Sequence, residues 1–406
     1  MSERVQSFID VLTDAGVVSR ADIEVARQQI RPTHADDTHS IMPADGPEDS
    51  GNMDVSLFLS TDDLRQADET LMISEHDVAH DAVALQSTPA AVMQLAHKLI
   101  HQSKLTEFQA RAAFKGDTRL LRCGAYILLD LIGSGGMGHV FKARHERSGE
   151  LFAIKILRDS ARRSPGRLAR FHREIEVTSR LSHANIVTAQ TAGESNGSHY
   201  LVMDLVDGQD LKSVVRNSSP VTVARAVHYI LQTARGLDYA HSQRLVHRDI
   251  KPANLLLDES DTVRILDLGL VQIVEDENDE NHIEDVTRLT VQGQVLGTPD
   301  YMSPEQAEDT RSVDHRTDIY SLGCTLHFLL TGRPPYLGST PVEVMMAHST
   351  RPIPYLRHQR ANIPVDLDEL FQHMMAKEAS DRPESLAPVI NRLETIAASL
   401  SEDHKN

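Results

Sequence analysis

A short polar run between two apolar segments, residues 247–254, constrains this chain more than any other feature. It places a carboxylate at Asp249, a cation at Lys251 and a carboxamide at Asn254. Phosphoryl transfer needs such a set, because one group must orient the attacking hydroxyl, one must neutralise the γ-phosphate and one must hold a metal ion. The run therefore predicts a loop that carries phosphoryl-transfer chemistry.

A glycine-rich run lies upstream, at residues 131–140, with glycines at 133, 135 and 138. Glycine lets backbone N–H groups approach phosphates without a Cβ clash. Apolar residues on both sides indicate a strand, a turn and a second strand. A dinucleotide-binding fingerprint would need a helix directly after the glycines, whereas the residues from Val140 onward are typical of a strand. By itself, the run is also compatible with a flexible hairpin that binds no ligand.

Six further segments accompany these two runs, and together they resemble the signature of protein kinases. The resemblance covers roughly residues 126–397 and implies an α+β fold with two lobes. The first lobe would be a small antiparallel sheet with one main helix, the second would be larger and helical, and ATP would bind between them. The segments that carry the resemblance follow the family's order, at residues 133–140, 152–155, 171–174, 199–208, 247–254, 263–269, 297–305 and 381–383.

The resemblance implies a catalytic role for five residues. Asp249 would orient the acceptor hydroxyl and take its proton, Lys251 would meet the γ-phosphate, and Thr298 would bridge the two. Lys155, held by Glu174, would fix the α- and β-phosphates. The alternative for Lys155 is an ordinary strand lysine that faces solvent, as most lysines do. A lysine two positions after the catalytic aspartate is typical of the serine/threonine class.

The resemblance also implies ATP and Mg²⁺. Backbone groups at Asp204 and Val206 would bind the adenine edge. Asn254 and Asp267 would hold two Mg²⁺ ions through oxygen ligands, which this hard cation prefers. Leu268 stands where the family usually has phenylalanine, which keeps Asp267 but changes its packing. The glycine run would cover the phosphates with Ile132, Gly133, Ser134, Gly135, Gly136, Met137, Gly138, His139 and Val140.

Two supporting pairs and a regulatory site follow from the same resemblance. Glu305 would pair with Arg382, and Asp318 would begin the buried helix that anchors the catalytic loop. Arg248 would bind a phosphate added to the segment before Thr298, which would bring about −1.5 to −2 charge. The candidate acceptors are Thr287 and Thr290. An acidic insert at residues 275–285 is a solvated loop or an internal mimic of that phosphate.

Composition limits the partners and the compartment. The formal net charge is −18, and no basic stripe points to nucleic acid. Only Cys123 and Cys324 are present, which argues against a disulfide framework and fits a reducing cytoplasm. No apolar leader opens the chain. The longest apolar stretch, near residues 319–330, is too short to span a bilayer, so we expect no membrane partner and a soluble chain.

The first 120 residues show a different organisation. Residues 1–30 predict a helical segment, 31–85 an acidic, disordered linker, and 86–120 a helical segment that resembles one found before the kinase domain in planctomycete kinases. Ser19 and Thr106 are the expected helix N-caps. The sequence leaves open whether the second segment packs on the small lobe, binds a partner or only extends the domain. A polar tail, 398–406, is expected after the kinase domain.

The sequence therefore predicts a serine/threonine protein kinase of the bacterial, eukaryotic-like type, acting on unidentified protein substrates in the cytoplasm. Relatives suggest a homodimer for autophosphorylation in trans. A pseudokinase or ATP-binding scaffold is the alternative. Such a protein normally lacks the lysine, the catalytic aspartate or the metal aspartate, and Lys155, Asp249 and Asp267 are all present.

Overall fold

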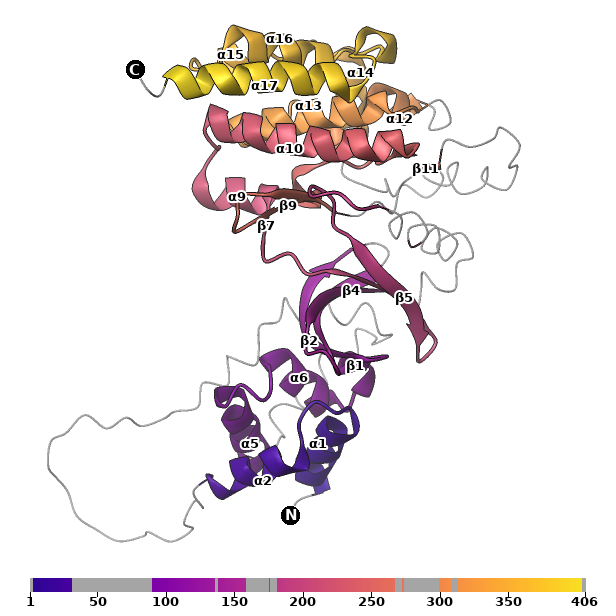
Figure 1. Ribbon diagram of the computed structural model, residues 1–406, viewed down its shortest axis with the longest axis vertical. Helices are drawn as coiled ribbons and strands as arrows, with labels where there is room; N and C mark the ends of the chain where they lie inside the picture. The colour runs from indigo at the N-terminus through magenta and orange to yellow at the C-terminus, as the bar shows by residue number, and fades with distance from the viewer. Residues whose placement is uncertain are drawn as a thin grey trace, which may run out of the picture. The chain divides into compact units, whose positions relative to one another are not determined.

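The structure is a computed structural model that divides into two compact units (Figure 1). The N-terminal unit comprises Met1–Leu168 and Thr191–Leu205, and the C-terminal unit comprises Ala169–Gln190 and Val206–Asn406. A curled sheet dominates the first and helices dominate the second, which confirms the predicted α+β class and two lobes. The residues that the structure describes are 3–30, 90–135, 138–157, 175, 181–266, 272–273, 299–308 and 313–403.

One antiparallel sheet forms the centre of the N-terminal unit. Its strand order is β1-β2-β3-β4-β6-β5, and β2, β3 and β4 are sequential hairpin neighbours. β-Branched and aromatic residues favour such strands because their side chains pack well on a pleated surface. The strands are β1 (Arg122–Cys123), β2 (Tyr126–Ser134), β3 (Gly138–His145), β4 (Leu151–Leu157), β5 (Ala189–Ser195) and β6 (Ser198–Asp204).

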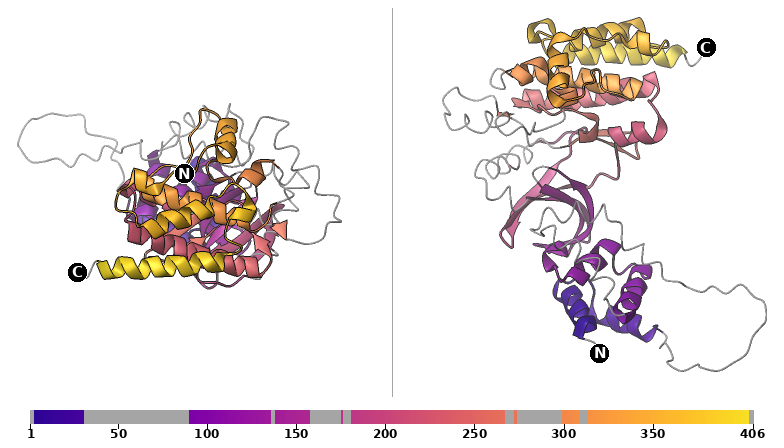
Figure 2. Two further views of the ribbon diagram at one scale, coloured as in Figure 1. Left: turned by 90° about the horizontal axis from the view of Figure 1, so that it is seen from above. Right: turned by 180° about the vertical axis from the view of Figure 1, so that it is seen from behind.

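Four α-helices pack together in the same unit. The Ser19 hydroxyl accepts the Asp22 N–H at 3.1 Å, and the Thr106 hydroxyl accepts the Gln109 N–H at 3.1 Å, so both predicted N-caps are confirmed. Two opposite views show these helices beside β1 and β2 (Figures 1 and 2). Their bounds are α1 (Glu3–Asp14), α2 (Arg20–Gln28), α5 (Ala90–His101) and α6 (Glu107–Lys115), followed by the short 3₁₀ helix η2 (Thr118–Leu120).

The helices cover one face of the sheet. Alternate side chains of a strand point to opposite faces, and Phe141, Ile154 and Val202 share one buried cluster with apolar residues of α1, α2, α5 and α6. The Phe108 ring of α6 lies 5.8 Å from that of Phe141. The second helical segment therefore packs on the small lobe, which is one of the possibilities that the sequence left open. The side chain of Lys155, next to Ile154 along the strand, belongs to the opposite face.

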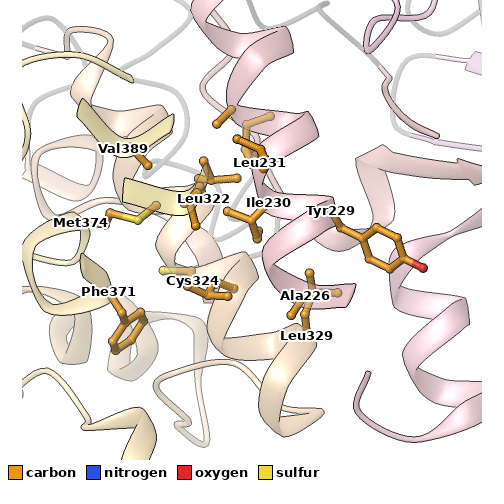
Figure 3. Packing of buried hydrophobic residues seen from close by; sticks show 14 of the residues in the cluster. Ala226, Tyr229, Ile230, Leu231, Leu322, Cys324, Leu329, Phe371, Met374 and Val389 are labelled. Atoms are coloured by element: carbon orange, nitrogen blue, oxygen red, sulfur yellow. The ribbon is translucent and has the colours of Figure 1, made fainter. Parts of the chain in front are cut away.

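The C-terminal unit is built around α10, which packs against both α13 and α17. Figure 3 shows side chains of α10, α13, α16 and α17 meeting in this core, where Ile230, Leu322, Phe371 and Val389 are buried. The helices are α9 (Leu211–Ser218), α10 (Val223–Ser242), α12 (Pro304–Glu308), α13 (Arg316–Thr331), α14 (Pro341–Thr350), α15 (Leu356–Gln359), α16 (Val365–Met374) and α17 (Leu386–Asp403).

Two small antiparallel sheets flank residues 247–254 in this unit. One has the order β10-β9-β7, and the other pairs β11 with β8. The polar run thus lies between the short paired strands β8 and β9. The strands are β7 (Gly208–Asp210), β8 (Leu245–Val246), β9 (Leu255–Asp258), β10 (Val263–Ile265) and β11 (Gln272–Ile273), and three 3₁₀ turns are η3 (Pro252–Asn254), η6 (Pro299–Tyr301) and η7 (Ala379–Asp381).

Some predicted features end elsewhere or lie outside the described residues. Helix α17 continues to Asp403, past the predicted end of the domain at 397, so the expected polar tail is largely helical. The expected linker, 31–85, and most of the predicted main helix of the small lobe, near residues 167–181, lie outside the described residues. Among the residues that are described, none of the helices is long and apolar enough to cross a bilayer.

Candidate active site

The predicted carboxylate, cation and carboxamide meet in one turn of the C-terminal unit. Lys251 Nζ lies 2.7 Å from Asp249 Oδ2, and Asn254 Nδ2 donates to the same oxygen at 3.0 Å. Asn254 Nδ2 also donates to the Asp249 backbone carbonyl at 2.8 Å. The Asp249 carboxylate is therefore held by two side chains while its side chain keeps 24% of its surface exposed. A partly exposed carboxylate fixed in this way is suited to accept a proton from a bound hydroxyl.

The His247 ring holds this turn through hydrogen bonds at both of its nitrogens. It is buried, and its Nδ1 accepts the Asp249 N–H at 3.2 Å. A neutral imidazole that accepts at one nitrogen carries its proton on the other, so Nε2 donates to the Leu266 carbonyl at 2.9 Å. The Leu266 N–H in turn donates to the Asn254 carbonyl at 2.8 Å. Residues 247–254 are thereby tied to the residue that immediately precedes Asp267.

The Asp318 carboxylate anchors the same turn, as the sequence predicts. It is fully buried at the start of α13 and accepts the N–H groups of His247 and Arg248, each at 2.8 Å. His241 Nε2 lies 2.8 Å from its Oδ2. Burial acts to raise the pKa of Asp318, but the hydrogen bond and charge of His241 and the contacts of His247 outweigh burial, so the pKa is lowered.

Arg248 is bound to the protein on both its backbone and its side chain. Its guanidinium Nη2 donates to the Val313 carbonyl at 2.8 Å, and its own carbonyl accepts from Gln306 Nε2 at 2.8 Å. Burial lowers the pKa of Arg248, and the charge of Asp318 opposes that shift. The predicted phosphate acceptors, Thr287 and Thr290, lie outside the described residues together with the 275–285 insert. Regulation through Arg248 stays a prediction.

The predicted pair of Glu305 and Arg382 is confirmed. The guanidinium and carboxylate make two parallel hydrogen bonds of 2.6 and 2.7 Å, and the Arg382 side chain has no exposed surface. The Arg382 guanidinium carbon also lies 4.9 Å from the centre of the Tyr320 ring. Bidentate geometry is the strongest arrangement for such a pair. It fixes the segment just after Ser303 to the helical core.

Lys155 and the glycine run come together in the N-terminal unit. The strand register places Val140 opposite Gly133 on one side and opposite Lys155 on the other. Side chains at opposite register positions share a face of the sheet. Only 7% of Lys155 is exposed, so the alternative of a solvent-facing strand lysine is wrong. The Gly135 N–H donates to the Gly138 carbonyl at 2.9 Å and closes the turn.

Gly138 shows why the run needs glycine where it meets β4. A Cβ built there would lie 2.2 Å from the Ile156 carbonyl oxygen, far inside any real contact. The strands can pair this closely only with no side chain at residue 138. Ile132, Ser134, Gly135 and His139 belong to the same hairpin, and the His139 ring is buried.

The predicted adenine-binding residues lie around the end of β6. Met203 pairs with Ala153 and Asp204 pairs with Phe152, so the strand delivers Asp204 at its last paired position. Val206 begins the next segment, in the C-terminal unit, and is partly buried. Gly136, Met137, Glu174, Asp267 and Thr298 lie outside the described residues. Their assignments, and the roles of the residues that are described, stay predictions.

Sequence reasoning missed three contributors to the turn. The His247 ring and the Gln306 amide bind the backbone of Asp249 and Arg248 directly. The His241 ring acts one step away, through the Asp318 carboxylate that accepts the N–H groups of the turn. His247 lies inside the recognised run, so its motif position could have revealed it. His241 and Gln306 lie apart from that run in the sequence, and no spacing rule connects them with it.

Comparisons with known proteins agree with this geometry. A serine/threonine-protein kinase PknB of Mycobacterium leprae is 37% identical over 268 residues, which is 64% of this chain and 41% of that protein. A PknB of Mycobacterium tuberculosis is 35% identical over the same length. A PknH of Mycobacterium bovis is 34% identical over 281 residues, 69% of this chain and 45% of that protein.

The chain spans less than half the length of these curated relatives. The family model described as a protein kinase domain matches residues 126–391, well over half of the chain. That range contains the glycine run, Lys155 and the turn that holds Asp249. The chain therefore belongs to the protein kinase family.

Proposed function

We propose that this chain is a serine/threonine protein kinase that transfers the γ-phosphate of ATP to serine or threonine hydroxyls of proteins. The observation that carries this proposal is the turn in which Lys251 and Asn254 both bind the Asp249 carboxylate, at 2.7 and 3.0 Å. The relatives named above are serine/threonine-protein kinases, which supports the substrate class. A pseudokinase is the less favoured alternative, because the residues that pseudokinases usually lose are present.

The catalytic step follows from the charges in the turn. Asp249 accepts the proton of the protein hydroxyl and orients its oxygen toward the γ-phosphate. Lys251, already next to Asp249, offers a compact positive charge to the phosphoryl oxygens, on which negative charge accumulates in the transition state. Because little covalent chemistry is asked of the protein, most of the rate enhancement comes from positioning and electrostatics. Thr298 completes the acceptor site in this proposal.

Asn254 fits the role of a Mg²⁺ ligand. Its Nδ2 is engaged by two oxygens of Asp249, so the amide is oriented and its Oδ1 remains available to a hard cation. Asp267 supplies the second protein ligand in this proposal. When bound, Mg²⁺ neutralises charge on the β- and γ-phosphates. Lys155, supported by Glu174, binds the α- and β-phosphates, and the glycine turn covers them.

The compartment and the self-regulation belong to the same proposal. Cys123 and Cys324 are both unpaired and buried, which suits a reducing cytoplasm. Burial raises the pKa of the Cys123 thiol to about 12, so it is a poor nucleophile. Autophosphorylation on Thr287 or Thr290, carried out between two copies of the chain, would bring a phosphate to Arg248.

The test is incubation of the purified chain with Mg²⁺ and labelled ATP, with phosphorylated sites mapped by mass spectrometry. We expect label on serine or threonine, and Asp249→Asn should lower transfer by about 10²- to 10⁴-fold while the chain stays folded. Asp366→Asn is the matched control, because Asp366 is exposed in the first turn of α16. Near-normal transfer by Asp249→Asn would refute the catalytic assignment. Nucleotide binding without any transfer would favour the scaffold.

A further inference from the structure

The first turn of α6 is bonded to the strand that leads into the glycine run. The Thr106 hydroxyl donates to the Leu129 carbonyl at 2.6 Å, and Gln109 Nε2 donates to the Leu128 carbonyl at 2.8 Å. Thr106 and Gln109 also form the capping box of α6, in which each side chain binds the other's backbone N–H. One pair of residues thus starts a helix and holds two consecutive carbonyls of β2.

Those two carbonyls lie at an irregularity of the sheet. The β2–β3 register shifts between Leu128 and Asp130, so Leu129 has no partner residue on β3. A bulge of this kind bends the strand and increases its twist. A second shift follows between Leu131 and Gly133. Only Asp130 and Leu131 are paired between the two shifts, so the first bulge sets the direction in which the strand enters the glycine turn.

The surroundings of the two side chains make this contact stiff. Gln109 is only 2% exposed, and both of its amide atoms are used, Oε1 by the Thr106 N–H and Nε2 by the Leu128 carbonyl. Phe108, between them in sequence, packs on Phe141 of β3. The helix therefore binds the sheet on both strands of the glycine hairpin. A buried carbonyl that loses its hydrogen-bond donor costs free energy, so the bulge would shift to a geometry in which that carbonyl finds another partner.

We propose that Thr106 and Gln109 are positioning residues for nucleotide binding, which set the glycine run through the bulge at Leu129. Neither residue is placed to touch ATP in the proposed function, on which this inference rests. The helices before the kinase domain would then set the affinity for the phosphates of the nucleotide, and would not only extend the domain. If the two residues act by positioning, their replacement should weaken nucleotide binding and leave kcat nearly unchanged.

The experiment compares Thr106→Val, which removes the hydroxyl, and Gln109→Met, which removes the amide at similar length, with the wild-type chain. The probe is a fluorescent ADP analogue with Mg²⁺, and the steady-state kinetics of phosphate transfer are measured beside it. Each variant should raise the Kd for the analogue and the KM for ATP by about fivefold or more, with kcat within about twofold. Thr106→Ser keeps the hydroxyl and should bind as the wild type does.

The matched control is Gln102→Ala. Gln102, just after α5, also donates a hydrogen bond to Gln29, the C-cap of α2, at 2.9 Å, but it does not contact β2 through any described bond. Thermal unfolding is followed for every variant. Unchanged Kd values in folded Thr106→Val and Gln109→Met would overturn the inference, and so would an equal loss in Gln102→Ala. Failure of both variants to fold would also overturn the inference, because the two residues would then be required for folding of the N-terminal unit and not for positioning the glycine run.

The two proposals fail in different ways. If the wild-type chain binds the analogue but transfers no phosphate, the proposed kinase activity fails, while the Kd series still decides the role of Thr106 and Gln109. If transfer is normal and the Kd series is flat, only the inference about positioning fails. If the wild-type chain does not bind the analogue, both proposals are refuted.

Discussion

Asp318 accepts the backbone N–H of Arg248 at 2.8 Å, at the point where the Arg248 backbone adopts a φ of 66°. This left-handed conformation is costly for a residue with a side chain, by about 1–3 kcal/mol. The buried carboxylate offsets that cost, because it also accepts the His247 N–H and faces His241. The bend that turns the Asp249 side chain toward Lys251 and Asn254 thus depends on a charge at the start of α13.

Asp318→Asn should therefore damage both stability and activity. An amide offers only one acceptor oxygen and points an NH₂ group at donors that the carboxylate now satisfies. We expect a loss of about 3 kcal/mol in the free energy of unfolding and a large fall in phosphate transfer. Urea unfolding and the transfer assay measure these. Asp314→Asn is the control, since Asp314 pairs with Arg316 at 3.5 Å with 47% of its side chain exposed. An Asp318→Asn chain as stable as this control would contradict the anchoring role.

The ion pair of Glu305 and Arg382 gives a second prediction. Removing one partner of a buried pair leaves an uncompensated charge, so Glu305→Ala should cost about 3–5 kcal/mol of unfolding free energy. The chain offers a matched surface pair, Arg235 and Glu394, with a similar distance of 2.7 Å but side chains 48% and 47% exposed. Glu394→Ala should cost at most about 1 kcal/mol. Equal losses in the two variants, measured by urea unfolding, would show that burial does not decide the strength here.

Much of the site could be predicted from sequence because catalysis fixes residue types at short spacings. Asp249, Lys251 and Asn254 lie within one turn, and their meeting follows from local chain geometry. The N-caps at Ser19 and Thr106 follow from equally local rules. The pair of Glu305 and Arg382 spans a long stretch of chain, and only the family resemblance predicted it.

The remaining features depend on distant backbone atoms. The bonds from Thr106 to Leu129 and from Gln109 to Leu128 require α6 to lie against a bulge in β2. The residue pattern of β2 does not predict that bulge. The burial of Lys155 follows from strand pairing with Val140 and Leu201, so the sequence left solvent exposure open. His241 reaches Asp318 only because α10 and α13 pack together.

Gly138 provides a third prediction. A methyl group there would lie 2.2 Å from the Ile156 carbonyl oxygen, so Gly138→Ala must push β3 away from β4. We expect a loss of about 1–3 kcal/mol in unfolding free energy, measured by urea unfolding. Gly135→Ala is the steric control, because a Cβ at Gly135 meets no atom of the described residues within 4 Å. That variant should stay within about 0.5 kcal/mol of the wild type. Comparable losses at both positions would mean that the turn, not the close approach of the strands, requires glycine.

Two buried histidines predict a loss of stability in mild acid. Burial lowers the pKa of His327 to about 4 and that of His348 to about 3, from an ordinary value of 6.5. His348 Nδ1 lies 2.8 Å from the Tyr320 hydroxyl, and Lys377 Nζ donates to the His348 carbonyl at 2.6 Å, so an added proton would enter beside a cation. Below about pH 6.5 the two histidines become protonated in the unfolded chain but stay neutral in the folded chain, so acid favours unfolding. Stability is therefore complete above that pH and declines as the pH falls toward the folded values.

The share of this decline that His348 contributes can be measured separately from that of His327. Each histidine contributes up to about 1.4 kcal/mol per pH unit below 6.5, so unfolding at pH 5.5 should need less urea than at pH 7.5. His348→Asn places an acceptor near the former Nδ1 and removes the titrating ring, and it should flatten the dependence by about 1 kcal/mol over this interval. Circular dichroism is the suitable signal, because the chain contains no tryptophan. His358→Asn, at an exposed position, should leave the slope as it is. If His348→Asn keeps the full slope, the acid sensitivity arises elsewhere, and the buried ring is protonated without cost to the fold.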